Sequence, residues 1–168
     1  MLLFAAALFF ATECEAQPDK TEGEKQLAYG AIGLGAVEPG FGGLAELTFA
    51  EDAFSLSAKG QGGGSINIFG SNESISWLSV SVGYQLLASP INARIALGPC
   101  YYWRSFDTAY LFGGGGHSEQ NGYGANAEID VILFHSKYFG LGAQLSAMLS
   151  RQKTFFGLTI NVLAGKLE

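Results

Sequence analysis

Six segments of the chain alternate apolar residues with polar or small residues at a period of two. In residues 78–86, for example, Leu78 and Val80 alternate with Ser79 and Ser81. The other five segments are residues 54–61, 91–103, 123–133, 139–149 and 156–164. Successive side chains of a β-strand point to opposite faces of its sheet, so this period predicts strands with one apolar face.

Two earlier segments bring the expected strands to eight. In residues 41–50, Ala45 and Leu47 lie on the face opposite to Glu46 and Thr48. Residues 26–37 are apolar on both faces, and their pattern does not assign an inward side. Each segment is close to the roughly 9–11 residues that a tilted strand needs to cross a membrane.

The chain lacks the charged coat of a typical soluble protein. It is 48% hydrophobic and 14% charged, whereas soluble domains contain about 25% charged residues. After the N-terminus it has no run of about 18 apolar residues, which a transmembrane helix would need. The 24 Gly, 13 Phe and 7 Tyr residues favour strands over helices. This composition fits a buried all-β domain or a membrane barrel.

The first residues have the pattern of a secretion signal. Leu2–Ala11 is apolar, and Ala16 before Gln17 provides a small residue at the expected cleavage point. We expect a signal peptide at residues 1–16, a polar leader at 17–25 and a barrel domain at 26–168. Cleavage leaves Cys100 as the single cysteine, so no disulfide framework is expected.

The connections between the expected strands alternate in length. Tight turns are expected at Glu51-Asp52, Ser89-Pro90 and His135–Lys137, and long polar loops at 61–76 and 105–121. Outer-membrane barrels have short turns on the periplasmic side and longer loops outside. With the N-terminus inside, the three tight turns are periplasmic and the two long loops are external.

The tight turns also predict strand register. The first turn would place Phe49 opposite Phe54, and the second would place Gln85 opposite Arg94. A slip of one residue would set apolar faces against polar ones. The third turn needs three residues to keep the faces matched, which predicts a bulge near Phe134.

Two features favour a membrane barrel over a soluble one. The polar face consists largely of Gly, Ser, Asn, Ala and Gln, which suits a crowded barrel interior. Aromatic residues gather near the strand ends, as in the girdles at both membrane interfaces. The expected outer belt is Tyr101, Trp103, Tyr123 and Phe156, and the expected inner belt is Phe49, Phe54, Tyr84 and Phe139. Ordinary aromatic packing in a protein core is the alternative interpretation.

Closure of the sheet follows from the membrane setting. Lipid cannot hydrogen-bond exposed amides, so a spanning sheet must close on itself. Eight strands leave an interior just wide enough for side chains to fill, which disfavours a wide porin channel.

Five charged residues occupy positions that would face inward: Glu46, Lys59, Arg94, Glu128 and Asp130. Buried unpaired charges are costly, so we expect partners among them. We predict a Glu46–Lys59 pair and a cluster of Arg94 with Glu128 and Asp130. Three acids against two bases leave one excess acid, which would be protonated or reach Arg104. The main interpretation is a network that fills and rigidifies the lumen, and a proton or ion path is the alternative.

These features resemble the small eight-stranded outer-membrane barrels, such as the families of OmpX, the membrane domain of OmpA and the opacity proteins. The likeness rests on three features: the Gly-rich first strand Tyr29–Gly35, the signal, and the connections, which are tight turns on the inner side and long loops on the outer side. It extends over roughly Gln26 to Leu167. The resemblance implies an all-β, eight-stranded antiparallel up-and-down transmembrane β-barrel in the bacterial outer membrane, and it names no activity.

Some barrels of this size modify lipid A, and one short segment could suggest such an enzyme. His117-Ser118-Glu119 places a His beside Ser and an acid, next to the glycines at 113–116. Adjacent residues point apart, whereas a catalytic triad needs its nucleophile and base within hydrogen-bond reach. We therefore expect a polar loop there, and no catalytic residues, metal ligands or cofactor.

The sequence favours a non-enzymatic outer-membrane barrel with a structural or surface-interaction role. We expect a monomer that contacts outer-membrane lipid and meets surface partners through the loops at 61–76 and 105–121. No nucleic-acid partner is expected, because the formal charge is −6 and basic residues are scattered. Two alternatives stay open: an outer-membrane lipid-modifying enzyme, and a secreted soluble barrel that binds an apolar ligand.

Overall fold

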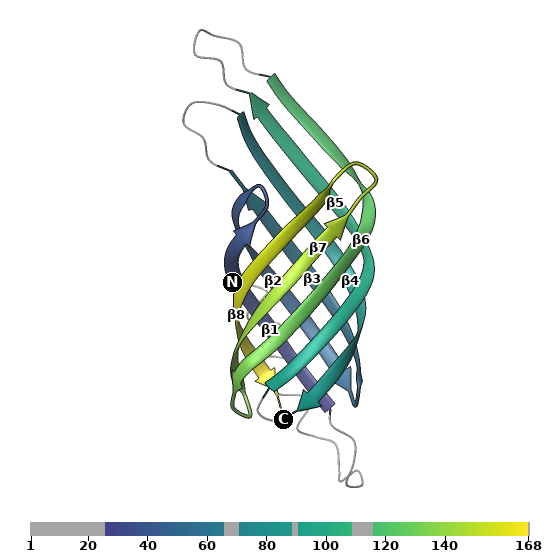
Figure 1. Cartoon of the computed structure of the whole chain (residues 1–168), viewed down its shortest axis with the longest axis vertical. Helices are drawn as coiled ribbons and strands as arrows, with labels where there is room; N and C mark the ends of the chain where they lie inside the picture. Colours follow the sequence, from purple (N-terminus) through teal and green to yellow (C-terminus); the bar gives the residue numbers. More distant parts are fainter. Residues whose placement is uncertain (1–25, 66–70, 89–90, 109–115, 168) are drawn as a thin grey trace.

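The computed structural model is a closed antiparallel barrel whose eight strands pair in chain order, as the sequence predicted (Figure 1). Its strands are β1 (Gln26–Val37), β2 (Gly40–Glu51), β3 (Phe54–Gly64), β4 (Ser71–Ala88), β5 (Ile91–Thr108), β6 (Gly116–His135), β7 (Phe139–Leu149) and β8 (Thr154–Lys166). β1 pairs with β8, which closes the barrel and leaves its wall without an edge.

The structure describes residues 26–65, 71–88, 91–108 and 116–167. Across these ranges it has no helix that could span a membrane. The expected signal peptide, the polar leader and the turn at Ser89-Pro90 lie outside the described residues.

The alternation in the sequence determines which side chains face the lumen. On β4 and β6, Val80 and Ile129 are exposed on the outer face, whereas Ser81 and Glu128 are buried inside. The inward side of β1, which the sequence left open, carries Leu27, Tyr29 and Ala31. Large aliphatic side chains thus cover the outside of the wall, and small or polar ones line most of the inside.

Two of the three hairpin predictions are confirmed and one is wrong. Gln85 pairs with Arg94, and the register of β6 against β7 shifts between Ile132 and Phe134, as a bulge requires. In the first hairpin, however, Glu51 pairs with Phe54, so Phe49 lies opposite Leu56 rather than Phe54.

The physical reason for this difference lies in the turn. Asp52 has a φ of 53°, a left-handed conformation that Asp tolerates better than most residues. The turn is therefore Asp52-Ala53, and Glu51 is the last strand residue. The register moves by two residues, which leaves apolar side chains facing apolar ones.

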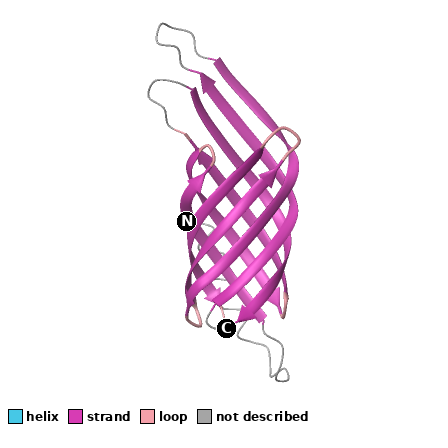
Figure 2. Ribbon diagram, viewed as in Figure 1, coloured by secondary structure: helices cyan, strands magenta, loops and turns pink. Residues whose placement is uncertain are grey.

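The described parts of the predicted loops at 61–76 and 105–121 are strand, except for Ser65. β3 continues to Gly64 and β4 starts at Ser71, while β5 runs to Thr108 and β6 starts at Gly116. β4, β5 and β6 therefore have 18, 18 and 20 residues, and they rise above the rest of the barrel (Figure 2). We call residues 71–74, 105–108 and 116–119 the outer sheet. Its Gly, Ser and Asn residues suggested loops, because composition alone does not separate a loop from a strand with water on both faces.

The lumen contains two apolar clusters at different heights. The lower cluster, near the start of β1 and the end of β8, is Leu27, Tyr29, Ala31, Ala50, Ile132, Leu163 and Leu167. The upper cluster, below the outer sheet, is Val37, Ile75, Trp77, Cys100, Tyr102, Met148 and Phe155. The charged and amide side chains of the lumen lie between these clusters.

Candidate functional site

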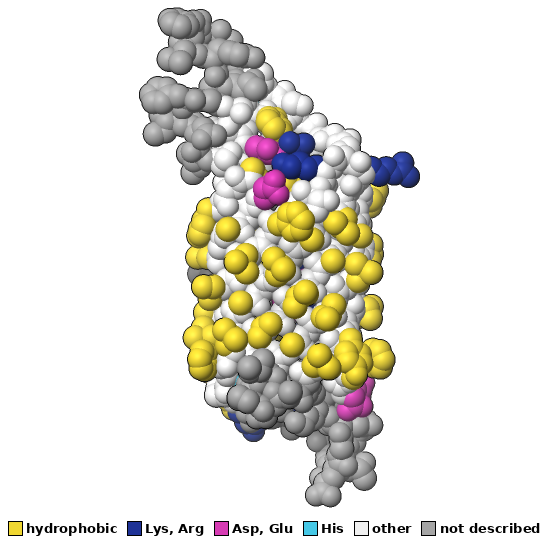
Figure 3. Space-filling view, in the orientation of Figure 1, with side chains coloured by type: hydrophobic (Ala, Val, Ile, Leu, Met, Phe, Trp, Pro, Cys, Tyr) yellow, Lys and Arg dark blue, Asp and Glu magenta, His cyan; other side chains and the backbone are white. Residues whose placement is uncertain are grey.

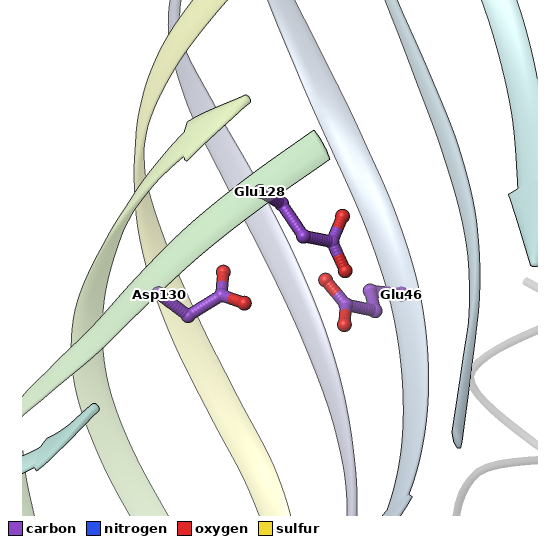
Figure 4. A group of neighbouring side chains, drawn as sticks. All are labelled: Glu46, Glu128 and Asp130. Carbon is purple, nitrogen blue, oxygen red and sulfur yellow. The ribbon is translucent and has the colours of Figure 1, made fainter. Parts of the chain in front are cut away.

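All five charged residues predicted for the lumen are buried inside the barrel wall. Their exposed fractions are between 2% and 9%. Glu46 comes from β2, Lys59 from β3, Arg94 from β5, and Glu128 and Asp130 from β6. Figure 4 shows the three carboxylates converging on one region of the lumen. The structure thus brings together residues that are up to 84 positions apart, from 46 to 130.

Arg94 is the centre of this group. It donates hydrogen bonds to Asp130 at 2.7 Å and to Glu128 at 2.9 Å. It also donates to Thr48 at 3.1 Å and to Glu46 on β2. One guanidinium therefore joins β5 and β6 to the strand on the far side of the lumen, using the fan of donors that Arg alone provides.

Lys59 pairs with Glu128, and the predicted Glu46–Lys59 pair is wrong. Lys59 Nζ lies 2.5 Å from Glu128 Oε2, although Glu46 is its direct neighbour across β2 and β3. Glu46 is bound by Arg94 and accepts a hydrogen bond from Gln144 at 2.9 Å. The long lysine side chain spans the lumen instead and joins β3 to Glu128 on β6.

The excess acid also does not reach Arg104. Arg104 Nε lies 2.6 Å from Glu73 Oε1, close to the outer sheet. The inner group keeps three acids and two bases.

The three carboxylates are close enough in geometry to be considered as cation ligands. Oxygen atoms from Glu46, Glu128 and Asp130 lie within 4.8 Å of one another. However, Arg94 contacts all three of these residues, and Lys59 contacts Glu128. The space among the carboxylates is thus taken by the protein's own cations, and the arrangement fits an internal ion network.

The neutral side chains of Asn126 and Gln144 extend this ion network through hydrogen bonds. Asn126 donates to Glu128 at 2.8 Å and accepts a hydrogen bond from Trp77 Nε1 at 3.2 Å. Gln144 donates to both Glu46 and Asp130 and accepts from Lys59 at 3.4 Å. Asn126 and Gln144 were not among the lumen residues predicted from the sequence. Their inward position in the alternation was the available signal, because an amide there must find a partner.

The eight belt residues all lie on the outer face. The expected outer belt has exposed fractions of 38% for Tyr101, 44% for Trp103, 83% for Tyr123 and 56% for Phe156, and the expected inner belt has 49% for Phe49, 67% for Phe54, 52% for Tyr84 and 66% for Phe139. Tyr101 and Tyr123 meet edge to face with their centroids 5.2 Å apart. Figure 3 shows a band of apolar side chains across one face of the barrel, with charged side chains above and below it.

Two ion pairs lie beside one aromatic ring near the outer end of the lumen. Arg104 pairs with Glu73, and Lys153 Nζ lies 3.1 Å from Glu38. Both cations lie over the buried ring of Phe155, at 5.5 Å for Arg104 and 4.6 Å for Lys153. Phe155 belongs to the upper apolar cluster, so both cations lie against this cluster.

His117, which the sequence places beside Ser118 and Glu119, lies in the outer sheet. Its Nδ1 is 2.6 Å from Asp107 and its Nε2 is 3.1 Å from Glu119. The hydrogen bond to Asp107, followed by that to Glu119, raises the pKa of His117 above its usual 6.5. Both ring nitrogens are engaged by carboxylates, and Ser118 points to the other face of the strand. The arrangement does not match a Ser-His-acid triad.

Comparisons with solved structures return barrels of the same architecture. The fold is that of small outer-membrane barrels. The N-terminal barrel domain of OprF from Pseudomonas aeruginosa matches with a TM-score of 0.58 and 13% identity, over 85% of this chain and 98% of that one. The attachment invasion locus protein Ail of Yersinia pestis matches with a TM-score of 0.55 and 11% identity, over 86% and 98%. Neisserial surface protein A matches with a TM-score of 0.53 and 14% identity, over 85% and 99%.

Sequence comparisons add no closer relationship. No protein-family model matches the chain, and no curated protein matches it. At identities of 11–14% the structural matches describe the fold, and the role has to be argued from this chain's own surfaces.

Proposed function

We propose that this chain is a bacterial outer-membrane barrel with a non-enzymatic, surface-interaction or structural role. One observation carries the proposal: the apolar side chains of the wall face outward. Val82, Leu97 and Ile160 are exposed by 63%, 61% and 72%. In the described ranges the charged side chains lie either in the lumen or at the two ends of the strands. An apolar band of this kind is stable in contact with lipid, whereas its exposure to water raises the free energy of the folded protein.

The outer sheet supports a role at the cell surface. It raises three strands beyond the apolar band and carries polar and charged side chains such as Asp107, His117 and Glu119. Two structural neighbours are named for attachment and for the cell surface, Ail and Neisserial surface protein A. We extend that general role to the outer sheet of this chain.

The packing of the lumen supports a protein that does not conduct. Two apolar clusters enclose the ion network from below and above. An ion entering the lumen would have to pass both clusters and displace the cations that already hold Glu46 and Glu128. In a planar bilayer we expect no stable open level for the folded protein, and a steady conductance would contradict this part of the proposal.

Surface labelling on intact cells tests the location and orientation. In a Cys100→Ala background, Ser118→Cys should react with a membrane-impermeant maleimide on whole cells. The matched variant Lys137→Cys, in the opposite turn, should react only after the outer membrane is permeabilised. Outer-membrane fractionation and a gel mobility that changes on heating complete the test. A protein that stays soluble and folded without detergent would overturn the proposal.

A further inference from the structure

Two lysines from distant parts of the sequence lie side by side at the inner end of the barrel. Lys137 is in the turn between β6 and β7, and Lys166 is the last residue of β8. The backbone N–H of Leu167 donates to the carbonyl of Lys137 at 3.0 Å, so the turn lies directly beside the end of β8. Both lysines are exposed. We call Lys137, Tyr138 and Lys166 the basic rim.

The backbone at the end of β8 holds Lys166 on the outside of the wall. Gly165 has a φ of 142°, which favours glycine. A Cβ on this residue would lie 2.3 Å from the carbonyl oxygen of Ala28. On its far side, Leu167 is 2% exposed and belongs to the lower apolar cluster. Because Leu167 is anchored in the lumen, the preceding side chain, that of Lys166, faces outward.

Aromatic side chains place the basic rim at the border of the apolar band. Lys137 Nζ lies 5.1 Å from the centre of the Tyr138 ring. The N–H of Gly165 donates to the carbonyl of Tyr138 at 3.0 Å, which fixes this residue against β8. Tyr138 precedes Phe139, a member of the inner belt. Tyr and Lys at such a border keep their polar ends at the level of the lipid headgroups.

The basic rim continues without a break into the apolar outer face of β7 and β8. Phe139 pairs with Ala164, and Leu141 pairs with Val162. The side chains of Phe139, Leu141 and Val162 are exposed by 66%, 47% and 56%. A molecule with an anionic head and an apolar tail would contact both surfaces at once. A free anion would contact only the lysines, so the surface fits a lipid better than a soluble ion.

The acidic side chains at this end lie on another part of the circumference. Among the described residues, the exposed acids of the inner end are Glu51 and Asp52, at the turn between β2 and β3. β1 separates β8 from β2, and Figure 3 shows basic and acidic side chains at separate places below the apolar band. The border beside β7 and β8 is therefore locally basic, although the chain has a formal charge of −6.

We propose that the basic rim binds the headgroup of an anionic glycerophospholipid in the periplasmic leaflet of the outer membrane. The ammonium groups of Lys137 and Lys166 contact the phosphate, and the acyl chains lie along Phe139 and Val162. Basic side chains close to a membrane surface attract anionic lipids in this way. The inference rests on the proposed membrane location and orientation of the barrel.

Native mass spectrometry of the purified, full-length barrel tests the inference. The protein is held in micelles that contain equal amounts of phosphatidylglycerol and phosphatidylcholine, and the lipids that stay bound are counted. We expect the first bound lipid to be phosphatidylglycerol, retained at least about fivefold more than phosphatidylcholine. Equal retention of the two lipids would overturn the proposal.

Single substitutions assign the lipid to the basic rim. Lys137→Gln and Lys166→Gln should each lower the retention of phosphatidylglycerol by about fivefold. Arg151→Gln, in the exposed turn at the other end of the barrel, makes the same change in net charge and should leave the retention unchanged. If all three variants lose phosphatidylglycerol equally, overall electrostatics explains the binding and the proposal is wrong.

Two further measurements separate loss of the cation from loss of the fold. Lys166→Arg keeps the charge and should keep the preference for phosphatidylglycerol, whereas a preference lost in this variant as well would contradict a role for the cation. The heat-dependent gel shift should persist in every variant, because no substituted side chain lies in the lumen.

Lipid A is the second source of anionic phosphate in such a membrane, and it lies in the outer leaflet. Added lipid A should not displace phosphatidylglycerol from the barrel. Displacement that Lys137→Gln and Lys166→Gln abolish would assign the basic rim to lipid A and overturn the proposal. Fractionation and surface labelling at Ser118→Cys do not depend on lipid binding. A failure of the lipid assays alone would therefore leave the proposed function intact.

Discussion

Arg94 holds the lumen network together, because its single guanidinium contacts acids from two strands on opposite sides of the barrel. Arg94→Leu would leave Glu46 and Asp130 buried without a cation. Removing one partner of a buried ion group costs about 3–5 kcal/mol. We expect the free energy of unfolding to fall by about that amount in urea titrations of the protein in lipid vesicles.

Arg151→Leu is the matched control, since Arg151 is exposed in the turn between β7 and β8. It should change the unfolding free energy by about 0.5 kcal/mol or less. Arg94→Lys should fall between the two, because an ammonium keeps the charge but cannot reach all the acceptors at once. Equal stability of Arg94→Leu and Arg151→Leu would show that the network is not a stabilising feature.

We expect the stability of the outer sheet to depend on pH through His117. Its pKa is raised above 6.5 in the folded protein, chiefly by the hydrogen bond to Asp107. A group whose folded pKa is raised stabilises the fold fully below its unfolded pKa and loses that contribution as the pH rises through the folded pKa. The amides of the β5–β6 hairpin should therefore exchange more slowly at pH about 6 than at pH about 8, after correction for the intrinsic rate.

The variant Asp107→Asn removes the main cause of the shift. An NMR titration of the His117 ring should give a lower pKa in this variant than in the parent protein. The difference in hairpin protection between the two pH values should shrink as well. A His117 that titrates at the same pH in both proteins would contradict the assigned cause.

At the scale of the elements, the outer sheet is separable from the barrel wall. Arg104 and Gln120 are paired across β5 and β6, so residues 105–119 can be replaced by Asn-Gly, which favours a two-residue hairpin turn. No lumen charge lies in the removed segment. We expect the heat-dependent gel shift to persist, because the removed segment supplies no side chain to the lumen network. Loss of the folded band would show that the outer sheet is needed to form the barrel.

The strands and their facing could be predicted from the sequence because both follow from local alternation. Val80 and Ser81 point to opposite faces in any strand, so the pattern alone separates the outer side chains from those in the lumen. The same rule placed Glu46, Lys59 and Arg94 inside. The rule did not assign the inward face of β1, because Leu27 and Ile32 are equally apolar and face opposite sides.

Pairing inside the lumen could not be predicted in the same way. The partner of Lys59 depends on which strands face each other across the barrel, which closure and strand stagger determine together. Neighbouring strands favoured Glu46, whereas the closed barrel brings Glu128 within 2.5 Å of Lys59 Nζ. The lengths of β4, β5 and β6 were not predicted for another reason. The polar residues of the outer sheet suit a loop and a strand surrounded by water equally well.

At the scale of the whole molecule, the barrel wall reverses the side-chain distribution of a soluble protein. Its apolar side chains face outward over the full height between the two aromatic belts, and its charges gather in the lumen and at the ends. This arrangement lowers the free energy in lipid, where the outer face is matched to the hydrocarbon and the closed sheet satisfies its backbone groups internally. In water, the same outer face would be a large exposed apolar surface.

A charge placed in the middle of the apolar band distinguishes these two settings. Val82 is 63% exposed on the outer face of β4, between Leu78 and Leu86. Val82→Arg should lower the unfolding free energy in lipid vesicles by about 2–4 kcal/mol, because Arg near the bilayer midplane loses its hydration. Tyr123→Arg, in the outer belt, should cost about 1 kcal/mol or less, since a charge at the interface keeps its water. In a soluble barrel both positions would be solvated, and both variants would have similarly small effects. A large cost at Val82 with a small cost at Tyr123 therefore follows from a wall that spans a membrane, and equal costs would contradict the membrane arrangement.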